Sequence, residues 1–164
     1  MTNLYIDFDG VIVNTIEISY KIAEEKGIER NYENYLQFFQ NLNWAEVLEK
    51  CEPINDSFNC IGKIIDSKKF NVAILTHVTS IHEAEEKVKL IRKYFDDITI
   101  IPVPKSISKT QMIKTEGSVL VDDFVDNLVQ WKEKGGIGIR FDLDMDGKGF
   151  PVIDRLDTLI DMLD

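Results

Sequence analysis

Residues 4–13, Leu-Tyr-Ile-Asp-Phe-Asp-Gly-Val-Ile-Val, decide how this chain folds. The apolar run at 4–6 is typical of a buried strand, and Gly10 ends the regular strand. In an extended chain residues i and i+2 point to the same side, so Asp7 and Asp9 lie together at the strand end. Two such carboxylates repel each other unless a cation or a shared proton relieves them. The pair therefore indicates either a solvated acidic turn or a metal site, and the rest of the chain decides between them.

Length and charge limit the class of protein. The chain has 164 residues, which is enough for one domain with a small insertion. Its formal net charge is −10, from 29 acidic and 19 basic residues. This charge disfavours binding of a nucleic acid polymer or an anionic membrane over a broad surface, although a local cation can still attract a small phosphorylated substrate.

Cysteine usage and hydropathy indicate a cellular compartment. Cys51 and Cys60 form no Cys-x-x-Cys pair, so we expect two reduced thiols, with one disulfide as the alternative. No basic and apolar leader precedes the first strand, and no apolar run approaches the ~18 residues of a membrane span. We therefore expect a cytoplasmic protein.

Strands and helices alternate along the chain. After the first strand, further strands are predicted at 70–75, 98–101, 118–121 and 137–141, and helices at 15–26, 81–94, 125–134 and 154–163. A helix after Pro53 should bury Phe58, Ile61, Ile64 and Ile65. Pro102 and Pro104 predict an irregular loop over 102–109. The alternation predicts parallel crossover units and hence a three-layer α/β fold with a Rossmann-like parallel sheet.

One region departs from this alternation. Residues 14–54 place several helices between the first two strands, more than one crossover needs. We interpret them as a small helical cap inserted after the first strand, and residues 1–13 and 55–164 as the α/β core. The cap is rich in aromatic side chains, which either pack its helices together or line a substrate pocket: Tyr32, Tyr35, Phe38, Phe39 and Trp44.

Polar side chains follow the ends of several predicted strands. Ligands of open parallel sheets bind beyond the carboxyl ends of the strands. The groups expected there are Asp7, Asp9, Thr76, Lys105 or Lys109, Asp122 and Asp123. Four carboxylates without a histidine or cysteine favour Mg²⁺ over zinc. A hydroxyl and an ammonium can bind a phosphoryl group, while one aspartate attacks it and a second moves a proton.

The constellation resembles the haloacid dehalogenase-like (HAD) superfamily. Three motifs carry the resemblance, in the family's order and over the whole chain: Asp7-Phe8-Asp9-Gly10-Val11, Ile74-Leu75-Thr76, and Val119-Leu120-Val121-Asp122-Asp123 with Asn127. The resemblance implies that Asp7 is the nucleophile and a metal ligand. Asp9 would be the acid/base and bind the metal through its backbone carbonyl. Asp123 would ligate the metal, and Asp122 would complete the metal site by ordering its waters.

The phosphate-binding residues are assigned less directly. Thr76 is the expected hydroxyl, and the backbone N–H of His77 would support it. Lys109 lies thirteen residues before Asp122 and is favoured over Lys105 as the phosphate-binding lysine. Further along, Lys87, Lys89, Arg92 and Lys93 are interpreted as the solvent-exposed face of a helix.

An acid at Asp9 is typical of the phosphatases of this superfamily, because its dehalogenases lack that acid. We therefore expect a Mg²⁺-dependent phosphomonoester hydrolase acting on a small phosphorylated metabolite. The alternatives are a phosphosugar mutase, which also keeps the acid, and a non-catalytic phosphate-sensing or scaffold protein. Residues 86–95 with the pair 122–123 are similar to the 5′(3′)-deoxyribonucleotidase branch, which makes a nucleotide the first candidate substrate.

Overall fold

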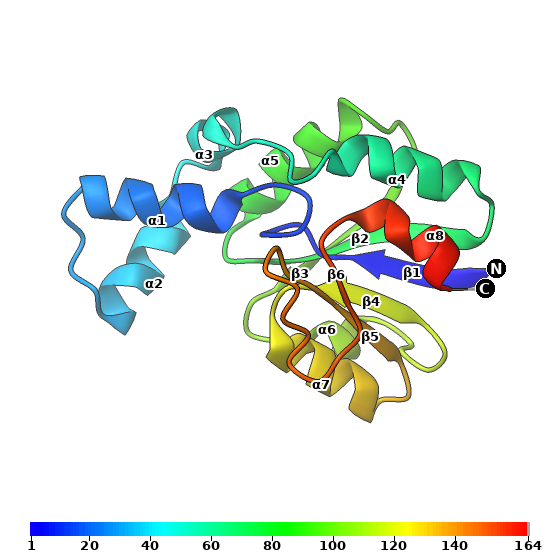
Figure 1. The fold of residues 1–164 in the computed structure, drawn as a ribbon. Helices are drawn as coiled ribbons and strands as arrows, with labels where there is room; N and C mark the ends of the chain where they lie inside the picture. Colours follow the sequence, from blue (N-terminus) through cyan, green and yellow to red (C-terminus); the bar gives the residue numbers. More distant parts are fainter. Residues whose placement is uncertain (164) are drawn as a thin grey trace.

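A parallel sheet forms the centre of the computed structural model, which describes residues 1–163 (Figure 1). Within these residues six strands pair in parallel in the order β3-β2-β1-β4-β5-β6. The strands are β1 (Thr2–Ile6), β2 (Phe70–Val78), β3 (Thr99–Pro104), β4 (Val119–Asp122), β5 (Ile137–Phe141) and β6 (Val152–Ile153). The helices are α1 (Thr15–Glu25), α2 (Tyr32–Asn41), α3 (Trp44–Lys50), α4 (Ser57–Asp66), α5 (Ile81–Arg92), α6 (Lys109–Met112), α7 (Val125–Glu133), the 3₁₀ turn η1 (Leu156–Thr158) and α8 (Leu159–Met162). The predicted three-layer α/β fold is confirmed.

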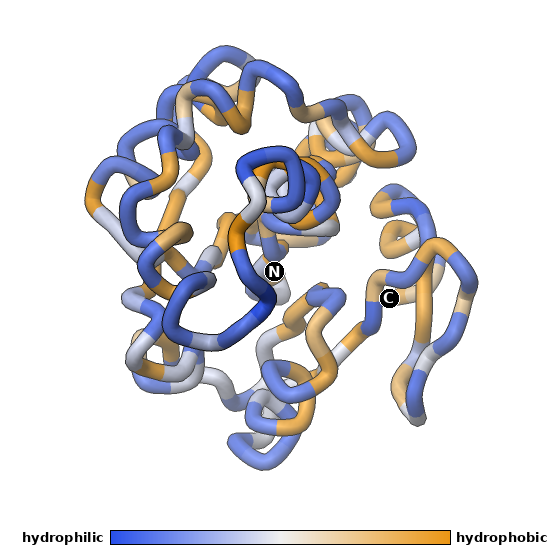
Figure 2. The backbone as a smooth tube through the Cα atoms, turned by 90° about the vertical axis from the view of Figure 1, so that its left-hand side faces the viewer, coloured by the Kyte–Doolittle hydropathy of each residue, from blue (hydrophilic) through white to orange (hydrophobic). Residues whose placement is uncertain are grey.

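The sheet is buried on both faces. Helices α4, α5 and α8 cover one face and α6 and α7 cover the other (Figure 1). Leu4 and Ile6 pack into the core on the first face, while Tyr5 packs with Trp131 of α7 on the second. A strand covered on both sides reads as a continuous apolar run, which is why β1 and β4 were recognisable. In Figure 2 the outer turns of the tube are largely hydrophilic, whereas hydrophobic segments lie mainly inside.

The third strand is longer than the sequence predicts. β3 continues through Pro102 and Pro104, where an irregular loop was expected. Strand β3 is an edge strand, and residues two apart direct their backbone nitrogens to the same side. Lys105 N donates to Val78 O of β2 at 2.9 Å, so the nitrogens of the two prolines face away from the sheet. A proline there removes no ladder hydrogen bond.

The C-terminal segment also differs from the expectation of one helix over 154–163. Strand β6 joins the sheet beside β5, and only η1 and the short α8 follow it. On α4 the expected buried side chains Phe58, Ile61 and Ile64 are buried, but Ile65 is 38% exposed.

The predicted cap helices α1, α2 and α3 lie beyond the carboxyl ends of the strands (Figure 1). The chain leaves the core and returns at one place, where Val13 forms a bridge with Pro53 and Ile54 N donates to Ile12 O at 2.9 Å. No side chain of α2 is fully buried. The domain boundaries at 14 and 54 stay a prediction.

Two observations bear on the cellular setting. Within residues 1–163 no helix is both long and apolar enough to cross a membrane. Cys51 and Cys60 are free thiols. Burial raises the pKa of the Cys51 thiol to about 12.

Candidate active site

The chain turns sharply just after β1. Asp7 N still donates to Val121 O of β4, and Ile12 N then donates back to Phe8 O, which closes a tight turn. Gly10 sits in this turn with φ +75°, a left-handed conformation that favours glycine. A Cβ atom on Gly10 would lie 2.4 Å from Asp123 Oδ2. Glycine at position 10 therefore leaves room for the carboxylate of Asp123, which follows β4, beside the end of β1.

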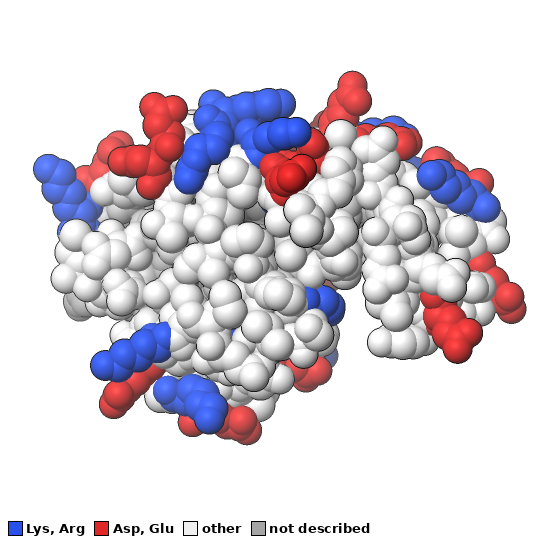
Figure 3. Space-filling view, turned by 180° about the vertical axis from the view of Figure 1, so that it is seen from behind, with Lys and Arg blue, Asp and Glu red and all other residues white. Residues whose placement is uncertain are grey.

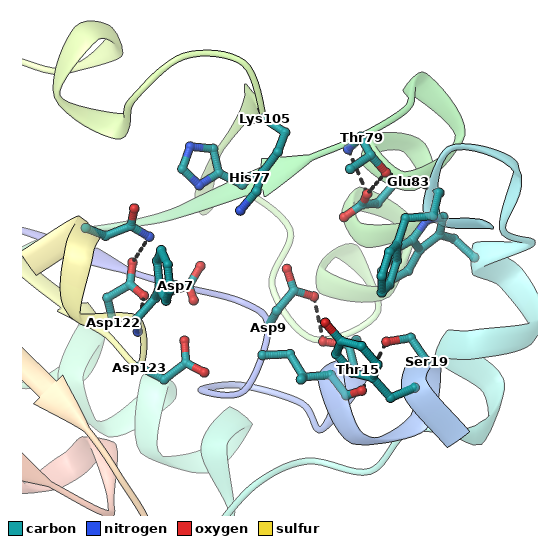
Figure 4. A pocket seen from close by; sticks show the side chains of 16 residues that line it. Asp7, Asp9, Thr15, Ser19, His77, Thr79, Glu83, Lys105, Asp122 and Asp123 are labelled. Atoms are coloured by element: carbon teal, nitrogen blue, oxygen red, sulfur yellow. Dashed lines mark hydrogen bonds between the residues drawn. The ribbon is translucent and has the colours of Figure 1, made fainter. Parts of the chain in front are cut away.

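Three carboxylates meet at the ends of β1 and β4. Asp7, Asp122 and Asp123 each offer an oxygen that lies within 4.8 Å of the other two, and Asp9 lies close by in Figure 4. The ammonium of Lys109 is buried between two of them, 2.8 Å from Asp7 Oδ1 and 2.7 Å from Asp122 Oδ2. The structure thus brings together the four aspartates that the sequence predicts for one site.

Hydrogen bonds fix the orientation of Asp122. Its Oδ1 accepts from Phe124 N at 2.9 Å, and its Oδ2 accepts from Asn127 Nδ2 at 3.0 Å. The carboxylate is fully buried, so these donors and Lys109 replace the water it has lost. Asn127, four residues after Asp123, has the role of an orienting donor.

The electrostatics of the cluster favour a cation. Burial, followed by the charge of Asp122, raises the pKa of Asp7 to about 7 against the opposing effect of Lys109. Burial, followed by the charge of Asp7, raises the pKa of Asp123 to about 9. For Lys109 burial lowers the pKa, but Asp7 and Asp122 outweigh it and the pKa is raised overall. The single charge of the buried Lys109 therefore cannot neutralise all the negative charge of the three carboxylates.

The donor set fits Mg²⁺. Every side-chain donor in the cluster is a carboxylate oxygen, the ligand that hard cations prefer. The carboxylate oxygens of Asp7 and Asp123 lie within 4.8 Å of each other, so the two groups repel each other when both are ionised. A divalent cation would relieve the same repulsion. Asp7 and Asp123 are the side chains placed to hold it.

A cavity of about 370 Å³ opens over the carboxylates, within the usual size range of ligand pockets. The core contributes the aspartates and His77, while Tyr20, Phe39 and Trp44 contribute aromatic surface from the cap helices. Among the described residues Lys105 is the one lysine or arginine that lines the cavity, and it points inward in Figure 4. In Figure 3 a cleft lies between two parts of the molecule, and charged side chains of both signs surround a broad uncharged area.

The predicted phosphate-binding residues take different positions. Lys109 lies behind the aspartates rather than in the cavity wall. Thr76 is buried within β2, and its hydroxyl accepts a hydrogen bond from Lys87. His77 lines the cavity, and its Nε2 lies 2.9 Å from Ile107 O. Burial lowers the pKa of His77. The binding of phosphate by these three residues stays a prediction.

The interpretation of Lys87 as solvent-exposed is wrong. The side chain is 0% exposed, and its ammonium lies 2.7 Å from Asp9 Oδ2 and 2.6 Å from Glu83 Oε2. Burial lowers its pKa, but Asp9 and Glu83 raise it overall. The sequence carried one signal for this position, because Glu83, Lys87 and the core residue Ile91 are four apart and share a helix face.

Solved structures of HAD-superfamily proteins share this fold. The structure is similar to a HAD phosphatase from Thermococcus onnurineus (17% identity, TM-score 0.65, covering 99% of this chain and 98% of that one). It is also similar to the putative HAD-hydrolase YfnB from Bacillus subtilis bound to magnesium (12% identity, TM-score 0.68, covering 99% of this chain and 98% of that one). A third similar structure is that of CbbY from Rhodobacter sphaeroides in complex with phosphate (13% identity, TM-score 0.59, covering 97% of this chain and 96% of that one). No family model matches the sequence, and a search of curated proteins gives no match.

Proposed function

We propose that the protein is a Mg²⁺-dependent phosphomonoester hydrolase that works through an aspartyl phosphate, an acyl phosphate formed on Asp7. The observation that carries the proposal is the cluster of Asp7, Asp122 and Asp123, in which Lys109 pairs with Asp7 and Asp122, and which lines one cavity together with Asp9. The similarity to HAD hydrolases, one of them bound to magnesium, supports this reading of the cluster.

Each residue would have a distinct task. The carboxylate of Asp7 attacks phosphorus, and the bond from phosphorus to the leaving oxygen breaks. Asp9 gives a proton to that oxygen and then takes one from the water that hydrolyses the aspartyl phosphate. Lys109 holds Asp7 in position by a 2.8 Å hydrogen bond, and Asp122 holds Lys109. Bound Mg²⁺ would offset the negative charge that phosphate brings to the carboxylates.

The cavity suggests the kind of substrate. Lys105 is placed to attract the phosphate, while Tyr20, Phe39 and Trp44 form an apolar wall for the remainder of the molecule. Aromatic surface of this kind accommodates a planar ring by stacking. A nucleoside monophosphate is therefore our first candidate, and a panel of nucleotides and sugar phosphates at equal concentration tests the preference.

The mechanism is tested with a chromogenic aryl phosphate, with and without Mg²⁺. Asp7→Asn keeps the shape of the side chain but removes the nucleophile, so the rate should fall by roughly 10⁴-fold or more, as for other catalytic nucleophiles. Asp126→Asn is the matched control, since Asp126 is an exposed residue of α7 and should leave the rate unchanged. Activity that survives Asp7→Asn would exclude the covalent mechanism. An inactive wild type on a broad panel of esters would favour a phosphate-sensing or scaffold role.

A further inference from the structure

Lys87 of α5 has the contacts of a built site rather than of a surface lysine. Its ammonium lies 2.7 Å from Asp9 Oδ2, 2.6 Å from Glu83 Oε2 and 3.0 Å from Thr76 Oγ1. A lysine ammonium has three N–H donors, and the hydrogen bonds of Lys87 go to Asp9 Oδ2, Thr76 Oγ1 and, at 3.2 Å, the carbonyl oxygen of His77. Glu83 forms an ion pair with the same ammonium. The rings of Phe8 and Trp44 lie 5.1 and 5.2 Å from Nζ and shield it from water.

Two donors, one of them Lys87, hold the two carboxylate oxygens of Asp9. Thr15 Oγ1 donates to Asp9 Oδ1 at 2.5 Å, and Lys87 donates to Oδ2. One donor comes from the first turn of α1 and the other from α5 in the core. Together they fix the plane of the carboxylate. Each oxygen keeps a lone pair, and the side chain of Asp9 is still 23% exposed toward the cavity.

Glu83 keeps Lys87 from moving. Its carboxylate is 4% exposed, and its Oε1 accepts from Thr79 N at 2.8 Å. Thr79 Oγ1 lies 2.9 Å from Glu83 Oε1 and 3.2 Å from the Phe39 carbonyl oxygen of α2. Glu83 thus holds the ammonium from within α5, and Thr79, which is hydrogen-bonded to Glu83, also contacts the cap.

Stability alone does not account for this arrangement. Replacing a buried ion pair by apolar side chains of similar volume is often neutral or stabilising. An apolar residue at position 87 would also fit between Phe8 and Trp44. What it would lack is a donor for Asp9.

We propose that Lys87 is a positioning residue that, with Thr15, holds the carboxyl group of Asp9 in line with the leaving oxygen of the substrate. The inference rests on the proposed function and adds to it a residue outside the four aspartates. Its effect is confined to the proton transfer that Asp9 carries out, because Lys87 is fully buried and does not line the cavity.

The test compares two esters that differ in how much the leaving oxygen needs a proton. p-Nitrophenolate departs readily without one, whereas the alkoxide of glycerol phosphate does not. The quantity measured is kcat/KM, which covers only the steps up to formation of the Asp7 phosphate. Lys87→Met should lower kcat/KM for glycerol phosphate by roughly 100-fold, the lower range for loss of general acid catalysis. For p-nitrophenyl phosphate the loss should stay below about tenfold.

Controls keep the result interpretable. Lys89→Met removes an exposed lysine of the same helix, which pairs with Glu86, and should change neither ester. If Lys87→Met does not fold by circular dichroism, the double variant Glu83→Gln with Lys87→Met removes both buried charges and carries the same test. Equal losses on the two esters, or no loss on either, would overturn the role of Lys87 while the proposed function stands. A wild type that hydrolyses neither ester would overturn both.

Discussion

The backbone conformation of a single residue, Gly10, leaves the room that the carboxylate cluster needs. Gly10→Ala should strain the left-handed backbone by about 1–2 kcal/mol and push Asp123 away, since the new Cβ would lie 2.4 Å from its Oδ2. Mg²⁺ affinity should fall by roughly 10–100-fold, as when a group that positions a metal ligand is lost. Isothermal titration calorimetry with MgCl₂ measures the effect.

Gly27→Ala separates the two causes. Gly27 also has a left-handed φ of +69°, but a Cβ there would meet nothing within 4 Å. This variant should lose a similar amount of stability in urea unfolding and bind Mg²⁺ like the wild type. If both variants bind Mg²⁺ equally well, the close approach to Asp123 has no role in metal binding.

The four aspartates and Lys109 were predictable as members of one site because each follows the apolar run of a strand or lies at a fixed spacing from one. Lys87 was not, because it lies among other lysines and acids on α5. A buried lysine and an exposed one give the same local pattern when a glutamate stands four residues away. Only the distant partner Asp9, in the turn after β1, distinguishes them.

Helix α4 shows the energetic consequence of facing the core. Ile64 is 0% exposed and belongs to the main core cluster, whereas the adjacent Ile65 is 38% exposed. Ile64→Ala should lower the free energy of unfolding by about 2–5 kcal/mol through the lost contacts and the cavity left behind. Ile65→Ala should cost less than about 1 kcal/mol. Urea unfolding followed by circular dichroism compares them, and equal costs would contradict the burial of only one.

At the scale of elements, β3 and β6 were the least predictable. A proline disfavours a strand only where its nitrogen would have donated to a neighbour. Whether Pro102 and Pro104 face such a neighbour depends on β3 lying at the sheet edge, which local sequence does not encode. Strand β6 has two residues, too few for any periodic pattern.

Taken as a whole, the metal-free protein should lose stability as pH rises. Asp7 and Asp123 have pKa values of about 7 and 9 in the folded protein, above the ~3.9 of an unfolded aspartate. Between roughly pH 4 and 9 these two groups therefore bind more protons in the folded chain than in the unfolded one, and their contribution to stability falls with rising pH. Thermal melts from pH 5 to 9 measure the trend.

Magnesium should reverse this loss, because at the proposed site it would bind the deprotonated form of the carboxylates. At a concentration 100 times the dissociation constant it should stabilise the fold by about 2.7 kcal/mol, or raise Tm by roughly 5–10 °C. At a fixed Mg²⁺ concentration the shift should be larger at pH 9 than at pH 6. Asp123→Asn should weaken both the pH trend and the shift. A shift that is the same at both pH values would contradict a site built from these carboxylates.

The three-layer fold followed from sequence because strands buried on both faces and alternating with helices leave few other arrangements. The order β3-β2-β1-β4-β5-β6 did not, since it depends on the direction in which each crossover turns. The cavity was predictable on its core side, where Asp7 and Asp122 follow their strands. The other wall of the cavity is formed by Tyr20, Phe39 and Trp44 and depends on how the cap helices α1, α2 and α3 pack over the sheet.

The meeting of Val13 and Pro53 has an evolutionary consequence. Because the chain leaves the core and returns to it at one place, the stretch between these residues is one continuous segment whose two ends lie side by side. Another peptide with similarly close ends could replace it without shifting β1 against β2. Selection could therefore exchange the cap wall of the cavity as one piece of coding sequence, while the carboxylates at the strand ends are inherited unchanged.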